Sequence, residues 1–408
     1  MPHLDVPQLL GLLVVIFAAA TLFGTLAQRI GQPAVLGELV AGVILGVSVA
    51  GLVDPNSEVL HLLAELGVVI LLFEIGLETN LRKLLEVGGA SALVAIVGVA
   101  LPFALGYAVC RALDLSNLVG IVAGATLTAT SVGITARVLS DLGRLQEPEG
   151  QIILGAAVAD DVIGLVILSV VAGLTEGHEA TAAGVAQTTG IAFGFLAATL
   201  LVGSLLVPRA MRLIGQVDLP GTATMLAVML ALALAWLASV AGSAMILGAF
   251  AAGLLLHATP QAREIERGVA HLGRFFVPIF FVSVGAAVDL RVLNPIDPAN
   301  HRTLLIGALL VVAAVVGKFL AGYAPFWFRG NKKVIGVGMI PRGEVGLIFA
   351  QMGLATGVFD AGIFSAVTLM VMVTTFMAPP LLKYLFPPVG GRRTPNEPEG
   401  IEQLVTEV

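Results

Sequence analysis

Two adjacent carboxylates, Asp160 and Asp161, are the side chains in this sequence best suited to reversible binding chemistry. They lie in an apolar run, at about residues 152–174, that holds no other charged residue. A run of this length can cross the hydrocarbon core of a bilayer, where each carboxylate costs roughly 2.5–3.5 kcal/mol. Adjacent carboxylates repel each other, so at least one should hold a proton more readily than an aspartate in water. Because the flanking residues leave no polar face for water, the pair predicts an intramembrane ion or proton site, not a soluble or surface helix.

Composition indicates a membrane protein with many spans. Of the 408 residues, 58% are hydrophobic and 12% are charged, about half the charged share of a soluble domain. The formal net charge of −6 argues against a nucleic-acid partner. A single cysteine excludes a disulfide framework within one chain, and six scattered histidines show no ligand spacing, so we expect no resident metal or cofactor. The N-terminal residues lack the basic region of a cleavable signal peptide, so the first apolar segment is expected to be retained.

The expected fold is an all-α polytopic membrane protein with about thirteen transmembrane helices. The spans are expected at residues 8–28, 33–52, 59–77, 88–110, 116–139, 150–174, 182–207, 221–239, 244–257, 274–288, 303–328, 333–356 and 362–385. The polar residues after Pro387 are expected to form a short disordered tail.

The positions of the basic residues predict the orientation. With the N-terminus outside, sixteen of the 21 Lys and Arg residues fall in loops and span ends on the cytoplasmic side. Only Arg111, Arg291 and Arg302 fall outside, and Lys318 and Arg342 lie within spans. An odd number of spans then places the C-terminus in the cytoplasm.

Three hydroxyl side chains lie near the middle of the fifth span, at Thr128, Thr130 and Ser131, just before Gly133. A single hydroxyl in a spanning helix more often bonds back to a carbonyl one turn earlier. Three within four positions beside a glycine favour a helix that is broken at its centre. A broken helix exposes helix ends and free carbonyls that can coordinate a small cation.

The twelfth span contains a second interruption around Pro341. Proline and four nearby glycines disfavour a continuous helix, and Arg342 and Glu344 would be costly in a plain span. The Arg342–Glu344 pair can neutralise the freed helix ends or contact an ion directly, and we favour the structural role. Pro341, Arg342 and Glu344 are therefore expected to support the broken helix.

Two interrupted helices, one in each half of the chain, predict an inverted-repeat transporter with two crossed broken helices. The interruptions are seven spans apart, as expected if two six-span repeats flank one linker helix. Lys318 lies one span before the second break, too far from either end of its span for its ammonium to reach water. It therefore needs a carboxylate partner, and Asp160 or Asp161 is the natural candidate.

Three other classes of protein fit the sequence less well. A cation channel needs a continuous polar pathway, whereas these spans offer isolated polar points. An intramembrane aspartyl protease would carry its two aspartates on different helices. A sodium-coupled solute symporter of related fold is the strongest alternative, although an organic substrate needs a larger polar pocket than these few groups provide.

Several stretches match the motifs of one family. They are residues 31–33 with Gly37 and Glu38, 64–67, 73 with 76–79, 129–139, 152–158 with 160–162, and 338–339 with 341–348. Together they cover nearly the whole chain and resemble the monovalent cation:proton antiporter-2 family. Glu74 departs from the family pattern, in which a hydrophobic residue is usual. We expect Glu74 either to face the interface between domains or to be a neutralised packing residue.

The resemblance implies two structural units. Residues 1–80 and 211–290 would form a scaffold domain of helices one to three and eight to ten, which dimerises. Residues 81–175 and 291–387 would form a core domain of helices four to six and eleven to thirteen, which holds the broken helices. Residues 176–210 would form the linker helix, and 388–408 a cytoplasmic tail.

The resemblance also implies transport, not enzymatic catalysis. The expected function is exchange of a monovalent cation, Na⁺ and also Li⁺, for protons across the bacterial inner membrane by alternating access, with net movement of charge. K⁺/H⁺ exchange is the alternative. The expected partners are the cation, protons, the lipid bilayer and a second copy of the chain in a homodimer.

On the family pattern, Asp161 alternately takes a proton or a cation, and Asp160 pairs with Lys318. Thr130 and Ser131 match the positions where the broken helices cross. A small hard cation prefers oxygen ligands, so Asp161 and Asp160 are the expected ligands of transported Na⁺. Protons compete for the same carboxylates, and binding of one then excludes the other.

Overall fold

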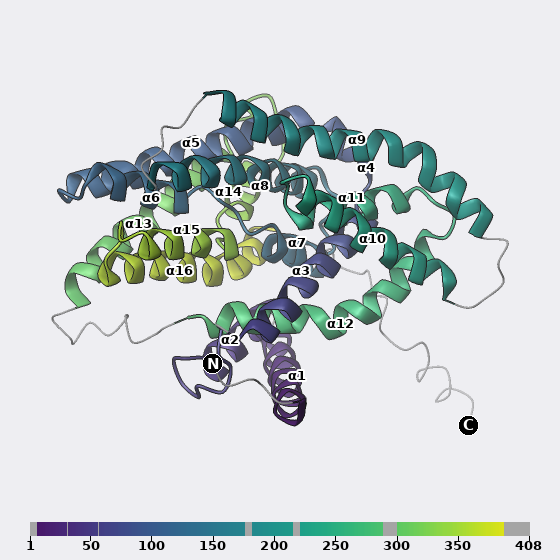
Figure 1. Cartoon of the computed structure of the whole chain (residues 1–408), viewed down its shortest axis with the longest axis horizontal. Coiled ribbons are helices and arrows are strands. Elements are labelled where there is room, and N and C mark those ends of the chain that lie inside the picture. Colours follow the sequence, from purple (N-terminus) through teal and green to yellow (C-terminus); the bar gives the residue numbers. More distant parts are fainter. Residues whose placement is uncertain are drawn as a thin grey trace, which may run out of the picture.

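The computed structural model describes residues 6–30, 32–55, 57–175, 182–214, 221–288 and 300–386, and helices are the regular elements within these ranges (Figure 1). The helices are α1 (Val6–Arg29), α2 (Ala34–Leu45), α3 (Glu58–Glu78), α4 (Leu81–Glu86), α5 (Gly88–Ala112), α6 (Asn117–Thr126), α7 (Val132–Asp141), α8 (Pro148–Thr175), α9 (Ala182–Ile214), α10 (Thr222–Val240), α11 (Met245–His257), α12 (Ala262–Ala286), α13 (His301–Ala321), α14 (Lys332–Gly338), α15 (Glu344–Ala355) and α16 (Ala361–Leu385).

Each of the thirteen expected spans corresponds to one of these helices or to a pair of short ones, which confirms the predicted all-α membrane fold. The fifth span is divided into α6 and α7, and the twelfth into α14 and α15. By length and composition, seven of the described helices can cross a bilayer on their own: α1, α3, α5, α10, α12, α13 and α16. The short helices α2, α6, α11 and α15 are also apolar. The expected tail lies outside the described residues.

Helix α12 is longer than the span expected in this region, residues 274–288. Helix α12 begins at Ala262, well before the expected position at residue 274. Its first turns carry charged residues such as Arg263 and Glu266 on one side, with Ile265 and Val269 buried on the other. An amphipathic start of this kind packs as helix without being apolar enough to be recognised as a span.

One group of helices packs around α3 and α12. Helix α3 contacts α11 and α12, α2 contacts α1 and α12, and α10 contacts α11. The α3–α11 contact depends on Gly76 and Gly253, because a Cβ at either would lie 2.4 Å from a carbonyl oxygen of the facing helix. Glycine therefore lets the two backbones approach closely, as is typical of helix packing in membranes.

A second group contains α5 to α8 and α13 to α16. Helix α5 contacts α6, α8 and α13, and α13 contacts α16. In Figure 1, α5, α6, α8, α13, α15 and α16 lie side by side, whereas α1, α2 and α12 lie below them. Helix α9 contacts α8 of this group and α10 and α11 of the other, so it joins the two. The groups also meet where α7 lies against α2 and α3.

Candidate ion-binding site

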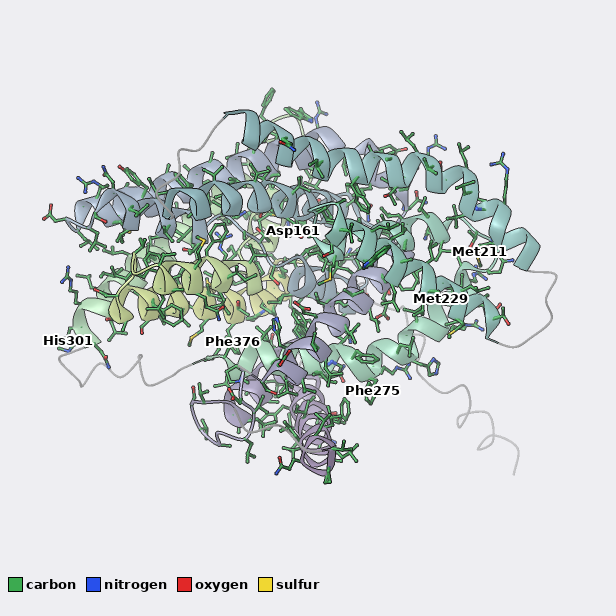
Figure 2. The ribbon with its side chains drawn as sticks, viewed as in Figure 1. Asp161, Met211, Met229, Phe275, His301 and Phe376 are labelled. Carbon is green, nitrogen blue, oxygen red and sulfur yellow. The ribbon has the colours of Figure 1, made fainter. Side chains whose placement is uncertain are left out.

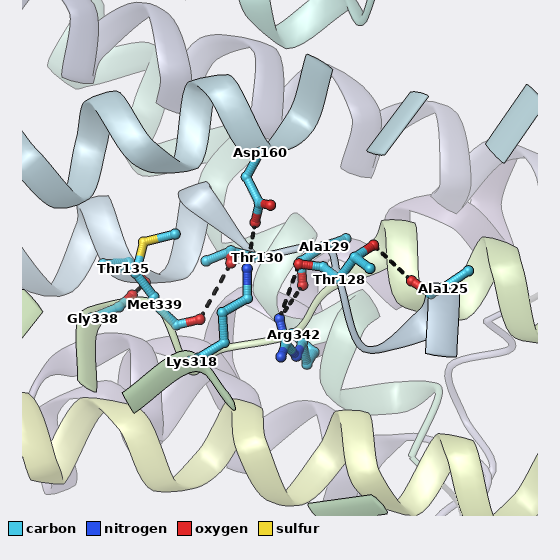
Figure 3. A network of polar contacts seen from close by, with 10 residues as sticks. All are labelled: Ala125, Thr128, Ala129, Thr130, Thr135, Asp160, Lys318, Gly338, Met339 and Arg342. Atoms are coloured by element: carbon cyan, nitrogen blue, oxygen red, sulfur yellow. Dashed lines mark hydrogen bonds and ion pairs between the residues drawn. The ribbon is translucent and has the colours of Figure 1, made fainter. Parts of the chain in front are cut away.

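Two short non-helical segments cross inside the second group of helices. One is residues 127–131, between α6 and α7, and the other is residues 339–343, between α14 and α15. The Ser131 amide donates a hydrogen bond of 2.8 Å to the Pro341 carbonyl. The Thr130 hydroxyl donates to the Met339 carbonyl at 3.2 Å (Figure 3). These contacts join residues that are about 210 positions apart in the chain, and they confirm the two crossed broken helices.

The amino-acid types at the crossing explain why both helices break there. The Thr128 hydroxyl donates to the Ala125 carbonyl at 2.7 Å and so satisfies one of the acceptors that the end of α6 leaves open. Pro341 has no amide hydrogen, which removes one hydrogen bond from any continuous helix. Gly343 permits the close approach, because a Cβ there would lie 2.7 Å from the Ser131 hydroxyl oxygen.

Arg342 supplies positive charge to the crossing. Its side chain is fully buried, and Nη1 donates to the Ala129 carbonyl at 2.6 Å and to the Thr128 carbonyl at 3.4 Å (Figure 3). These carbonyls follow the C-terminal end of α6, where the helix dipole is negative. The Arg342 carbonyl in turn accepts a hydrogen bond from the Thr375 hydroxyl on α16. The side chain of Glu344 lies outside the described residues, so the expected Arg342–Glu344 pair stays a prediction.

Asp160 on α8 and Lys318 on α13 form a buried ion pair. The Lys318 ammonium lies 2.8 Å from Asp160 Oδ2, and neither side chain is exposed (Figure 3). The charges of Asp160, Arg342 and Asp161 all act on this ammonium. Gly98 on α5 leaves room for it, because a Cβ there would lie 3.4 Å from Nζ. Asp160 Oδ1 has no hydrogen-bond partner within the described part of the chain.

Asp161 follows Asp160 in the middle of α8 and is 4% exposed. It lies near the centre of the molecule, far from either end of the helix bundle (Figure 2). The Ser131 hydroxyl at the crossing is also buried, and its oxygen has no hydrogen-bond partner among the described residues. The region therefore combines carboxylate, hydroxyl and carbonyl oxygens, which are the ligands of small hard cations and, at the carboxylates, of protons.

Two residues at the crossing gave no separate signal in the sequence. The Thr135 hydroxyl donates to the Gly338 carbonyl at 2.8 Å, one turn beyond the break, and Thr375 contacts Arg342 from α16. Either hydroxyl could have bonded within its own helix, as Thr374 does with the Met370 carbonyl. Whether such a hydroxyl bonds within its own helix or to the other segment is therefore seen only in the three-dimensional structure.

A polar cavity of about 1080 Å³ lies between the two groups of helices. Its walls come from α1, α2, α3, α7, α12 and α16. Their charged residues are the acids Glu38, Glu74, Glu78, Asp141 and Glu266 and the basic residues Arg137, Arg267, Arg274 and Lys383. Glu74, whose place the sequence left open, therefore faces the region where α3 meets α7. As a group these acids gave no signal in the sequence, although Glu38 and Glu78 lie in motif stretches and Glu74 departs from the family pattern.

Comparison with known proteins places the chain in a family. Residues 15–386 match the family model described as "Sodium/hydrogen exchanger, transmembrane". The High-affinity Na(+)/H(+) antiporter NhaS3 of Synechocystis is 41% identical over 95% of this chain and 91% of its own length. The Na(+)/H(+)-K(+) antiporter GerN of Bacillus cereus is 33% identical over 92% of this chain and 95% of its own.

A solved structure supports the fold. The sodium proton antiporter MjNhaP1 of Methanocaldococcus jannaschii matches with a TM-score of 0.67, covering 92% of this chain and 95% of that protein, at 18% identity. At that identity the likeness establishes the fold alone. The family match extends over most of the sequence, and so the chain belongs to the transmembrane sodium/hydrogen exchanger family.

Proposed function

We propose that this protein exchanges a monovalent cation, Na⁺ and also Li⁺, for protons across the bacterial inner membrane. The observation that carries the proposal is the buried Asp160–Lys318 pair, which lies in one network with the crossing of the two broken helices. Each charge is costly in a membrane-spanning helix, and such residues are typically paired with each other and mark functional sites. The names of the relatives, which are cation/proton antiporters, support the same reading.

The chemistry of exchange follows from competition for oxygen atoms. Na⁺ binds carboxylate, hydroxyl and carbonyl oxygens, and a proton binds the same carboxylates. We assign the carrier role to Asp161, with Asp160 as a second ligand and Thr130 and Ser131 as hydroxyl ligands or supports. Because Asp160, Asp161 and Lys318 interact, they take up protons as a coupled set. Exchange without leak requires that the site, when it is empty and fully ionised, changes its access from one side of the membrane to the other only slowly.

The two groups of helices suggest how access alternates. We assign α1 to α3 and α10 to α12 to a scaffold domain that dimerises, and α5 to α8 and α13 to α16 to a moving core. Each half of this core has the same order of a long helix, a broken helix and a long helix, which supports an inverted repeat. Helix α9 would be the linker. With the N-terminus outside and the C-terminus in the cytoplasm, most basic loop residues face the cytoplasm.

Exchange of K⁺ is the second candidate. The printed name of GerN includes K⁺ beside Na⁺, and carboxylates and hydroxyls bind both ions. Selectivity then depends on the size of the cavity that the ligands form.

The test uses purified protein in liposomes with an acidic interior and a dye that reports the pH difference. Addition of NaCl or LiCl outside is expected to dissipate the gradient, with KCl as the comparison. An imposed membrane potential should change the rate, because net charge moves. The proposal fails if none of the three cations moves protons. Uptake of an organic solute together with Na⁺ would then favour the symporter.

A further inference from the structure

The polar cavity between the two groups of helices, here called the vestibule, approaches the ion site along α7. Arg137, Ser140 and Asp141 line it, and they belong to the helix whose first residue, Val132, follows the crossing. Arg137 is six residues beyond Ser131, which corresponds to about 9 Å along a helix with a rise of 1.5 Å per residue. The wall of the vestibule therefore comes close to the place where the proposed site binds its cation.

The described residues that line the vestibule include five acids, Glu38, Glu74, Glu78, Asp141 and Glu266, and four basic residues, Arg137, Arg267, Arg274 and Lys383, beside His271. Glu38, Glu74, Glu78 and Asp141 all act electrostatically on a single guanidinium, that of Arg137. Arg137 Nε lies 3.2 Å from Asp141 Oδ1, so its nearest partner is on its own helix. Of the four basic residues, Arg137 is the one that acts on Glu38, and it is shared with three other carboxylates, so the charge of Glu38 is only partly compensated.

Two of the four acids have a partner of their own. Asp141 has Arg137, and Glu78 Oε2 accepts a hydrogen bond of 2.8 Å from the Ser140 hydroxyl. Glu74 is half-buried, and its Oε2 would lie 2.7 Å from a Cβ on Gly273 of α12. That oxygen has no hydrogen-bond partner within the described ranges.

Glu38 is the most deeply buried of these four acids. Its side chain, on α2, lines the vestibule although the residue is only 8% exposed, and its Oε2 has no hydrogen-bond partner in the described part of the chain. A buried carboxylate without hydrogen bonds is unfavourable unless a positive charge compensates it. Arg137 acts on Glu38 but is shared with the other acids, so Glu38 needs a further positive charge.

We propose that Glu38 binds the transported monovalent cation in the vestibule, at a second site separate from Asp160 and Asp161. This inference rests on the proposed function, because it takes the same cation as its ligand. No three acidic side chains in the described residues converge to hold a metal ion. The cation therefore keeps much of its water and contacts the protein through the Glu38 carboxylate. A cavity of about 1080 Å³ has ample space for a hydrated ion, since one water occupies about 30 Å³.

The two sites differ in what they do. At the crossing, a cation and a proton exclude each other on the same carboxylates, which is the basis of exchange. At Glu38 a cation is held by one carboxylate in the cavity that α7 also lines, and no coupling to a proton is needed. Glu38 is therefore a binding residue of the entry path and not a carrier.

Binding of ²²Na⁺ to purified protein separates the two sites. In the Asp161→Asn protein, where the central site is disabled, residual binding of one Na⁺ per chain is expected. Adding Glu38→Gln should lower the affinity of that residual site by at least tenfold. The matched control is Glu264→Gln, which removes an exposed carboxylate of α12 that does not line the vestibule and should leave residual binding unchanged.

Crystals soaked in Tl⁺, which stands for the monovalent cation, give an independent measurement. An anomalous peak beside the Glu38 carboxylate is expected in the Asp161→Asn protein, and Glu38→Asp should retain it. The inference is overturned if residual binding is absent, if it survives Glu38→Gln, or if Glu38 takes up a proton in place of Na⁺. Cation-driven proton flux by the wild-type protein is measured in parallel. If the flux is present but binding at Glu38 is absent, the second site is wrong and the proposed function stands; if the flux is absent, the proposed function itself fails.

Discussion

The Lys318 ammonium lies 2.8 Å from Asp160 Oδ2, and both side chains are completely buried. A buried pair of this kind does little for stability on balance, but loss of one partner leaves the other charge without compensation. We therefore predict that Lys318→Gln lowers the free energy of unfolding by about 3–5 kcal/mol, the usual cost of breaking a buried pair. The melting temperature of the detergent-purified protein measures this effect.

Lys318→Gln also tests whether the lysine takes part in charge movement. If Lys318 carries the extra proton, the variant should exchange cations for protons without responding to an imposed membrane potential. Lys333→Gln is the matched control, because that lysine is exposed at the start of α14. Equal melting temperatures and equal voltage responses in wild type and Lys318→Gln would show that the pair has neither role.

The hydroxyls of Thr130 and Ser131 are predicted to affect cation affinity more than the maximal rate. Both lie at the crossing, and the Ser131 hydroxyl oxygen is buried without a hydrogen-bond partner among the described residues. Replacing both residues with alanine removes oxygen atoms but leaves the carboxylates in place. The apparent KM for Na⁺ and for Li⁺ should rise about tenfold, equivalent to about 1.4 kcal/mol of binding energy. Unchanged KM values for both ions would leave these hydroxyls with a structural role only.

Gly343 is predicted to be required for the crossing. A Cβ at this position would lie 2.7 Å from the Ser131 hydroxyl oxygen, so Gly343→Ala must push the two segments apart. Overpacking of this kind typically costs about 1–3 kcal/mol, and the melting temperature should fall together with the exchange rate. Gly88→Ala, where a Cβ would contact nothing within 4 Å, should change neither quantity. If the two variants behave alike, the close approach at Gly343 is not important.

Much of this fold could be predicted from the sequence because the length of an apolar run and the polar residues that end it are local properties. Pro341 and the three hydroxyls around Thr130 indicated both helix breaks, and the structure joins them through the Ser131–Pro341 hydrogen bond. The first turns of α12 were not predicted as part of a span because they are charged. The cluster of Glu38, Glu78 and Asp141 was not predicted, although Glu38 and Glu78 lie in motif stretches, because the three acids come together only when α2, α3 and α7 pack. Such a cluster depends on tertiary contacts, which no local pattern reports.

The most direct test of the account is cation-driven proton flux in the Asp161→Asn protein. This substitution keeps the shape of the side chain but removes the carboxylate proposed to carry the cation and the proton. Membrane insertion should survive, because the substitution removes a buried charge from the middle of α8. In liposomes that contain equal amounts of folded protein, the wild type should show flux on addition of Na⁺ or Li⁺, and Asp161→Asn should show none. Exchange by Asp161→Asn at a rate close to that of the wild type would contradict the assignment of Asp161 as the carrier.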